Sequence, residues 1–222
     1  MVVFFLKSNI IGRAGDDIVI KFDVKKEYPQ LYRATTKKIS SLVVPKLKYI
    51  AIDGIGNPTV PEFRNKSKLL FLMNKSLKEY YQKQDISFSG SKLEGIWDTY
   101  DNSHFDVTRK KMIKYTLMML QPPILTENML EEIKLELLSK TGDYFTLDIY
   151  LKEFEEGESI QMLHIGPYNT EINSTKQIME YITVANLKLS GLHHEIYLNK
   201  PERVAQENLK TIVRYPVEED LV

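Results

Sequence analysis

Cysteine is absent from the 222 residues of this chain. Its absence excludes disulfides, thiolate nucleophiles and cysteine-ligated zinc, and it fits a reducing compartment, so we expect a cytoplasmic protein. An excess of one charge is absent too, because 30 lysines and arginines balance 30 aspartates and glutamates. Since nucleic-acid binding normally needs a basic surface, we expect no direct binding to nucleic acid.

Long hydrophobic runs are also missing. No stretch approaches the roughly 20 apolar residues of a membrane helix, so we expect no membrane association. The apolar start, Met1 to Leu6, has neither the basic region before it nor the small-residue cleavage site after it that mark a signal peptide. Hydrophobic residues still make up 43% of the chain, which is enough for a substantial core.

Catalytic and metal-binding patterns are scarce. The chain has no Gly-x-Ser-x-Gly sequence and no phosphate-binding glycine-rich loop. His193 and His194 are adjacent, and neighbouring strand residues point to opposite faces, so the two cannot bind one metal ion together. A metal site would require His164 to converge with His193 and Glu195. We therefore predict no metal and no cofactor.

Residue patterns predict an α+β fold. Helical spacing or capping residues predict helices between Thr59 and Tyr81, from Thr126 to about Gly142, and from about Ser174 to Leu189. The segment Glu155 to Glu158 is interpreted as a hairpin turn. Short apolar or alternating runs predict strands near 49–56, 93–100, 115–120, 144–151, 159–165, 193–198 and 211–217.

The two halves of the chain repeat one order of elements: strand, Gly/Pro turn, helix, and a strand that carries an aromatic. Gly56 and Gly166 mark the turns, and Ile96-Trp97 matches Ile196-Tyr197. This pattern indicates a diverged duplication. We divide the chain into a lead-in that packs on the main domain, residues 1–42, and a main domain, residues 43–217, with repeats near 43–125 and 143–217.

Strand alternation then predicts a binding groove. If Ile96 and Ile196 face their helices, the opposite face carries Trp97, Tyr197, Glu195 and Gly95. Pairing of the two helix-free faces would place the helices outside and a groove between the repeats, with open space above Gly95. Aromatic walls and one carboxylate suit a flat or cationic organic ligand.

Four motifs in this order make the chain resemble the GyrI-like small-molecule-binding family, which also occurs as the effector domain of multidrug-sensing transcription regulators. The motifs are Tyr49 to Pro58, Leu93 to Trp97, His164 to Tyr168, and Gly191 to Leu198, with Leu120 to Pro123 as a weaker fifth. The resemblance implies duplicated βαββ repeats, antiparallel sheets forming a central ligand groove, and a pocket glutamate that corresponds to Glu195. No helix-turn-helix pattern precedes the motifs, so we expect a stand-alone member.

The leading functional hypothesis is binding of amphipathic or cationic xenobiotics. Trp97 and Tyr197 would stack on the ligand, Glu195 would supply a counter-charge, Gly95 would leave room, and Tyr168 would line the rim. The plainer alternatives are a core tryptophan, a salt-bridged strand glutamate and a surface tyrosine.

The resemblance also implies two other functions. Some stand-alone relatives hydrolyse strained, cyclopropane-containing toxic compounds; here Glu195 would activate water and Tyr197 would donate a proton. Many hydrolase-like relatives have a second tryptophan where this chain has Asp98, a departure that argues against hydrolysis. Other relatives inhibit DNA gyrase, which makes a protein-interaction module the third alternative.

Overall fold

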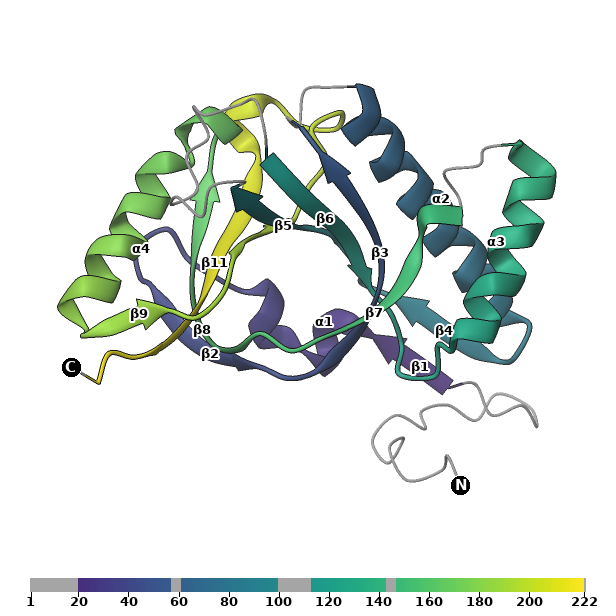
Figure 1. Cartoon of the computed structure of the whole chain (residues 1–222), viewed down its shortest axis with the longest axis horizontal. Coiled ribbons are helices and arrows are strands. Elements are labelled where there is room, and N and C mark those ends of the chain that lie inside the picture. The colour runs from purple at the N-terminus through teal and green to yellow at the C-terminus, as the bar shows by residue number, and fades with distance from the viewer. Residues whose placement is uncertain (1–19, 57–60, 100–112, 143–146, 222) are drawn as a thin grey trace.

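The computed structural model describes residues 20–56, 61–99, 113–142 and 147–221 (Figure 1). It confirms a mixed α+β fold with an open antiparallel sheet and helices on the outside. In chain order the elements are β1 (Ile20–Asp23), α1 (Val24–Glu27), η2 (Pro29–Tyr32), β2 (Ser40–Val44), β3 (Leu47–Ile55), α2 (Pro61–Gln82), β4 (Ile86–Ser89), β5 (Leu93–Thr99), β6 (Ile113–Leu120), α3 (Glu127–Thr141), β7 (Tyr150–Phe154), β8 (Gly157–Ile165), η4 (Tyr168–Thr170), α4 (Ile172–Val184), β9 (Leu187–Leu189), β10 (His193–Tyr197), η5 (Gln206–Asn208) and β11 (Lys210–Glu219).

One large sheet joins the two repeats edge to edge. Its strand order is β2-β8-β11-β10-β5-β6-β3-β7, and β9 adds to the end of β11. The strand order is symmetric about the contact between β10 and β5: β10 corresponds to β5, β11 to β6 and β8 to β3. Each repeat therefore contributes strand, helix, strand and strand, which is the predicted βαββ plan.

Local sequence signals set the helix ends. The Thr126 side chain accepts a hydrogen bond from the Met129 backbone N–H at the start of α3, and Gly142 ends this helix with a φ of 67°. The third predicted helix stops earlier than expected. Asn186 adopts a φ of 54°, and the chain continues as β9 up to Leu189, so the expected helix end at Leu189 and stop at Gly191 are wrong.

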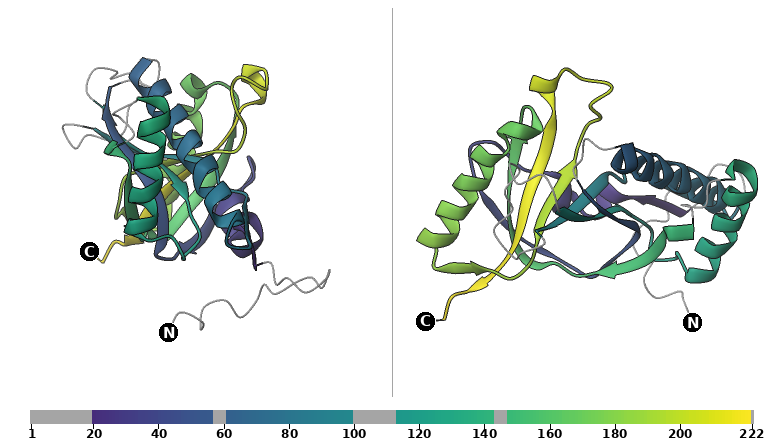
Figure 2. Two further views of the ribbon diagram at one scale, coloured as in Figure 1. Left: turned by 90° about the vertical axis from the view of Figure 1, so that its right-hand side faces the viewer. Right: turned by 45° about the horizontal axis from the view of Figure 1, so that its top comes forward.

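The expected hairpin at Glu155 to Glu158 is also wrong. Strand β7 pairs with β3 at one end of the sheet, whereas β8 pairs with β2 and β11 at the other. Only Glu155 and Glu156 separate β7 from β8, so the two ends of the strand order come close together here, and the right-hand view of Figure 2 shows the chain crossing directly from one to the other. Glu156, in the middle of this crossing, is buried and binds Arg214 rather than turning in solvent.

The segment before β2 packs on the sheet face that carries Ile196 and Arg214. Its Leu31 and Tyr32 are only 2% and 7% exposed, and Tyr28 is half-buried against the same core. The helices in the described ranges include none that is long and apolar enough to cross a membrane. The expected capping box at Thr59 begins in residues 57–60, outside the described part.

A buried polar network joins this segment to the sheet. Arg214 donates to Glu156 at 3.1 Å, to the Gln161 side chain at 2.9 and 3.0 Å, and to the Leu31 carbonyl at 2.7 Å. His194 lies 2.9 Å from Glu156. Burial opposes ionisation, but His194 and Arg214 outweigh it and lower the pKa of Glu156 to about 2. Arg214 thus compensates a carboxylate that has no access to water.

We predict that Arg214→Leu lowers the free energy of unfolding by about 3–5 kcal/mol, because it leaves the Glu156 carboxylate buried and unpaired. Urea denaturation measures the change. The matched control is Arg203→Leu at an exposed position, with an expected change within about 0.5 kcal/mol. Equal stability of the two variants would show that the network contributes little.

Candidate functional site

Strand register brings the predicted site residues from both repeats onto one face of the sheet. Glu195 of β10 lies opposite Gly95 of β5, and His193 lies opposite Trp97. Because alternate residues share a face, Tyr197 belongs to the same set. We call Gly95, Trp97, Tyr168, Glu195 and Tyr197 the central site.

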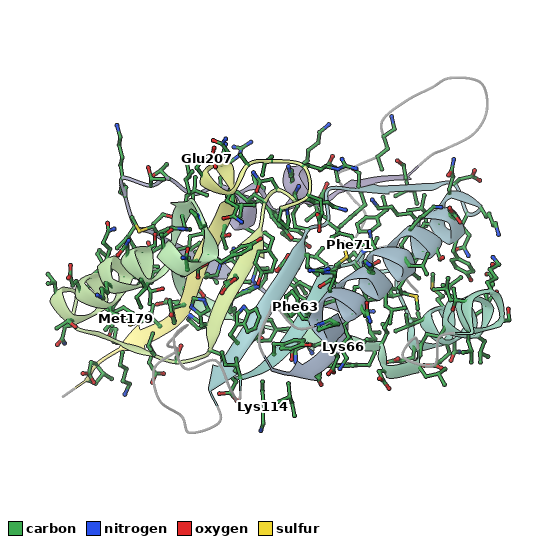
Figure 3. The ribbon with its side chains drawn as sticks, turned by 90° about the horizontal axis from the view of Figure 1, so that it is seen from above. Phe63, Lys66, Phe71, Lys114, Met179 and Glu207 are labelled. Carbon is green, nitrogen blue, oxygen red and sulfur yellow. The ribbon has the colours of Figure 1, made fainter. Side chains whose placement is uncertain are left out.

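Helices flank the central site on this same face, which corrects the expected orientation. Phe63 of α2 stacks on Trp97, while Ile178 of α4 packs in a cluster with Val213, which lies opposite Glu195 in the register. Seen from above, α4 and α2 lie on either side of the central strands (Figure 3). Face-to-face packing of helix-free surfaces was expected. Edge-to-edge joining of the repeats instead puts both helices on one side.

Trp97 is a covered aromatic in this structure. It is only 1% exposed, with the Phe63 ring stacked at 5.7 Å and 18° and the Tyr115 ring at 5.6 Å. Gly95 does not have the expected open space above it. A Cβ there would meet Trp97 Nε1 at 3.0 Å and the Tyr197 hydroxyl at 3.2 Å. The lack of a side chain lets these two polar groups approach the strand.

Glu195 forms the acidic centre of the site and is 6% exposed. The Tyr197 hydroxyl hydrogen-bonds to Glu195, and burial followed by the Glu195 charge raises the pKa of Tyr197 well above 10, so this phenol stays protonated. Tyr168, 38% exposed, meets the Tyr197 ring edge to face at 5.9 Å. The site therefore has a carboxylate beside a pair of tyrosine rings.

A second buried glutamate, Glu171, lies next to the first: their side chains hydrogen-bond to each other and share a histidine. His193 Nε2 lies 3.1 Å from Oε1 of Glu171 and 3.1 Å from Oε1 of Glu195. Its Nδ1 lies 2.6 Å from the Tyr215 hydroxyl. Burial opposes protonation of the ring, but Tyr215 and the two carboxylates outweigh it and raise the pKa of His193 well above its usual value. Burial and then the Glu195 charge raise the pKa of Glu171 to about 7.

A metal ion is the other chemistry that this group could support. Within the described ranges, ligand atoms of Glu171, His193 and Glu195 lie within 4.8 Å of one another. A metal would have to replace the Nε2 proton, which lies between the two carboxylates with Nε2 at 3.1 Å from each. We therefore assign these residues to a hydrogen-bonded cluster. His164 lies apart from it, 3.1 Å from Ser174 and 3.2 Å from Thr170.

A hollow of about 650 Å³ lies beside the central site, next to Tyr115. Its lining comes from β3, α2, β5 and β6, with Leu192, and includes Asp98 but not Glu195 or Tyr197. Asp98, which stands where hydrolase-like relatives have a second tryptophan, therefore borders this hollow from the strand face opposite Trp97.

Two residues of this region escaped the sequence analysis. Glu171 is at the N-cap position of α4, where an acidic residue normally bonds backbone N–H groups, yet its side chain makes no such bond. Phe63 follows the predicted helix start, seven residues before Leu70, and so continues the buried face of α2, but it was not used to predict this helix. The sequence held one signal for each residue: Phe63 is an aromatic in the first turn of a predicted helix, and Glu171 is an acid close after the Gly-Pro-Tyr turn.

Comparison with known proteins identifies the class to which this fold and site belong. A family model described as the GyrI-like small molecule binding domain matches residues 37–218. The chain belongs to this family, and the resemblance drawn from its motifs is confirmed. A search among curated proteins finds no match.

Solved structures agree with this assignment. An uncharacterized conserved protein from Listeria innocua is 29% identical, with a TM-score of 0.81 over 88% of this chain and 99% of that chain. A hydrolase from Listeria innocua is 28% identical, with a TM-score of 0.80 over 89% and 100%. The C-terminal domain of EcmrR, 11% identical over 82% and 98% with a TM-score of 0.53, shares the fold.

We predict that Phe63→Ala exposes Trp97, because Phe63 covers the indole from the α2 side. Trp97 is the single tryptophan, so its fluorescence should become more sensitive to a soluble quencher. The loss of contacts should cost about 0.5–3 kcal/mol of stability. Phe71→Ala, elsewhere on the same helix, is the control. Unchanged quenching in Phe63→Ala would contradict the stacked arrangement.

Proposed function

We propose that the protein binds flat cationic or amphipathic organic molecules at the central site, with Glu195 as counter-charge. Membership of a small-molecule-binding family supports the general activity. The observation that carries the choice of ligand is the nearly buried Glu195 carboxylate beside the rings of Tyr197 and Tyr168. A buried carboxylate attracts a desolvated cation strongly, and aromatic faces add cation–π attraction.

Phe63 shows how a flat ligand would be accommodated. Its ring lies nearly parallel to the Trp97 indole, at 18°, and it is only half-buried. A planar ring of a ligand would gain the same stacking if Phe63 turned aside. Tyr197 and Glu195 would then border the ligand from the second repeat. This arrangement gives Trp97 the role of a stacking platform, and Tyr168 that of a rim.

We predict that Glu195→Gln weakens binding of N-methylquinolinium about tenfold, which corresponds to about 1.4 kcal/mol. Its uncharged carbon isostere, methylnaphthalene, should bind with unchanged affinity, because stacking does not depend on the carboxylate. Titrations that follow Trp97 fluorescence measure both constants. Glu94→Gln, a buried glutamate on the opposite sheet face, is the control. Equal losses for the two compounds would rule out the counter-charge role.

A second candidate function is hydrolysis of a strained electrophilic ring, such as a cyclopropane conjugated to a carbonyl. The hydrolase from Listeria innocua, similar over 89% of this chain, favours it, as does the hydrogen bond between Tyr197 and Glu195. Glu195 would take a proton from water while the water oxygen attacks a ring carbon. The ring bond would break, and Tyr197 would protonate the resulting enolate oxygen.

This candidate makes a distinct prediction. Mass spectrometry of a cyclopropane-containing compound incubated with the protein should show the addition of one water. Glu195→Gln should reduce turnover about 10²–10⁴-fold while retaining binding of the compound, because it removes the general base but keeps the shape of the site. Native turnover in this variant would exclude the mechanism. The gyrase-interaction alternative stays a prediction.

A further inference from the structure

Glu171 lies directly beneath the central site without forming part of its surface. It is 2% exposed, at the junction of η4 and α4, and its carboxylate contacts His193 rather than the backbone of its own helix. A buried glutamate that leaves a helix N-terminus unused is costly unless another interaction compensates it. The compensation here comes from the same imidazole that holds Glu195.

One imidazole nitrogen serves two carboxylates. His193 Nε2 is equidistant, at 3.1 Å, from Glu171 and Glu195, so its single N–H is shared between them. Tyr215 holds the other ring nitrogen at 2.6 Å. The ring cannot turn toward either glutamate without straining its bond to Tyr215. The position and the effective charge of Glu195 therefore depend on the protonation of Glu171.

We propose that Glu171 is a specificity-determining residue for the central site: through His193 and through its own contact with Glu195 it sets the charge available at Glu195, and thereby the preference of the site for cations over neutral ligands. This inference rests on the proposed binding function. Glu171 itself does not touch the ligand, and His193 and Tyr215 position it relative to Glu195.

The sign of the effect follows from the charges of the cluster. With Glu171 protonated, the positive His193 and the negative Glu195 cancel. With Glu171 ionised, the cluster carries one net negative charge. Since the pKa of Glu171 is raised to about 7, the change occurs near neutral pH, and a bound cation favours the ionised form. Cation affinity should therefore rise as the pH increases through this range.

The tyrosines around Glu171 do not reproduce this change near neutral pH. Burial raises the pKa values of Tyr197 on β10, Tyr215 on β11 and Tyr168 on η4. His164 on β8 hydrogen-bonds to Ser174 and Thr170, outside the cluster of Glu171, His193 and Glu195. Glu202, in the loop after β10, acts on Tyr168 at the rim.

The test compares N-methylquinolinium and methylnaphthalene, by Trp97 fluorescence, from about pH 6 to about pH 8. If a bound cation lowers the pKa of Glu171 from about 7 by about one unit, the affinity of the native protein for the cation rises about fivefold from pH 6 to pH 8, toward a tenfold limit. Methylnaphthalene binding stays constant. Glu171→Gln, which keeps an acceptor for His193, abolishes the rise and holds the cation affinity at the low-pH value. A rise that persists in Glu171→Gln would overturn the proposal.

The opposite face of β10 offers a matched control. His194 likewise lies between two glutamates, at 3.2 Å from Glu94 and 2.9 Å from Glu156. Glu156→Gln removes an equally buried carboxylate from this second cluster, at a cost in stability. It should leave the pH dependence of cation binding intact. Loss of that dependence in Glu156→Gln would show that general destabilisation, and not the linkage through His193, is responsible.

A measurement without ligand separates this inference from the proposed function. In nitrogen-labelled protein, the His193 ring signals should shift as Glu171 ionises near neutral pH, and this step should vanish in Glu171→Gln while His193 stays protonated. A step that remains in the variant refutes the linkage. If the step is present but neither compound binds at any pH, the proposed function fails, and the inferred cation preference fails with it.

Discussion

The antiparallel contact between β5 and β10 is the interaction on which the remaining structure depends. It joins the two repeats into one sheet and puts Gly95 opposite Glu195, and Trp97 opposite His193. Directly opposed residues on antiparallel strands lie about 4.5–5.5 Å apart, so this register alone assembles a composite site from both halves of the chain. It also places α2 and α4 on the same face, where they enclose the site from both sides.

Alternation along β10 produces two Glu–His–Glu clusters with different electrostatics. On the face toward the N-terminal segment, His194 contacts Glu94 and Glu156, and Arg214 also binds Glu156, so two positive groups can balance two negative ones. On the helix-flanked face, one imidazolium and tyrosine hydroxyls hold Glu171 and Glu195. The first cluster is suited to fixing the fold. The second cluster carries one net negative charge when Glu171 is ionised, and we propose that a cationic ligand neutralises it. Perturbed charges of this kind are typical of functional sites.

The sequence predicts those features that depend on local chemistry. The Thr126 cap, the Gly142 stop and the alternation that groups Trp97 with Gly95 follow from residue types and spacing. Which strands become neighbours does not, because distant pairings decide it. The segment around Glu156 has the composition of a turn. Glu156 is nevertheless buried, because it binds Arg214, 58 residues away. The side on which the helices lie depends likewise on how the repeats meet.

Glu171 illustrates the same limit at the level of the site. The Gly-Pro-Tyr turn before Glu171 points to this region of the chain but does not predict burial of the carboxylate, since its role arises from His193, 22 residues later. The cluster also explains how a site with a nearly buried charge remains compatible with a stable fold. Backbone pairing and the Arg214 network hold β10 from the opposite face, so rearrangement of Phe63 or a change of protonation at Glu171 leaves the strand in place. A carboxylate such as Glu195 can discriminate between ligands by charge only if the strand that carries it is held rigidly while the side chains around it adapt.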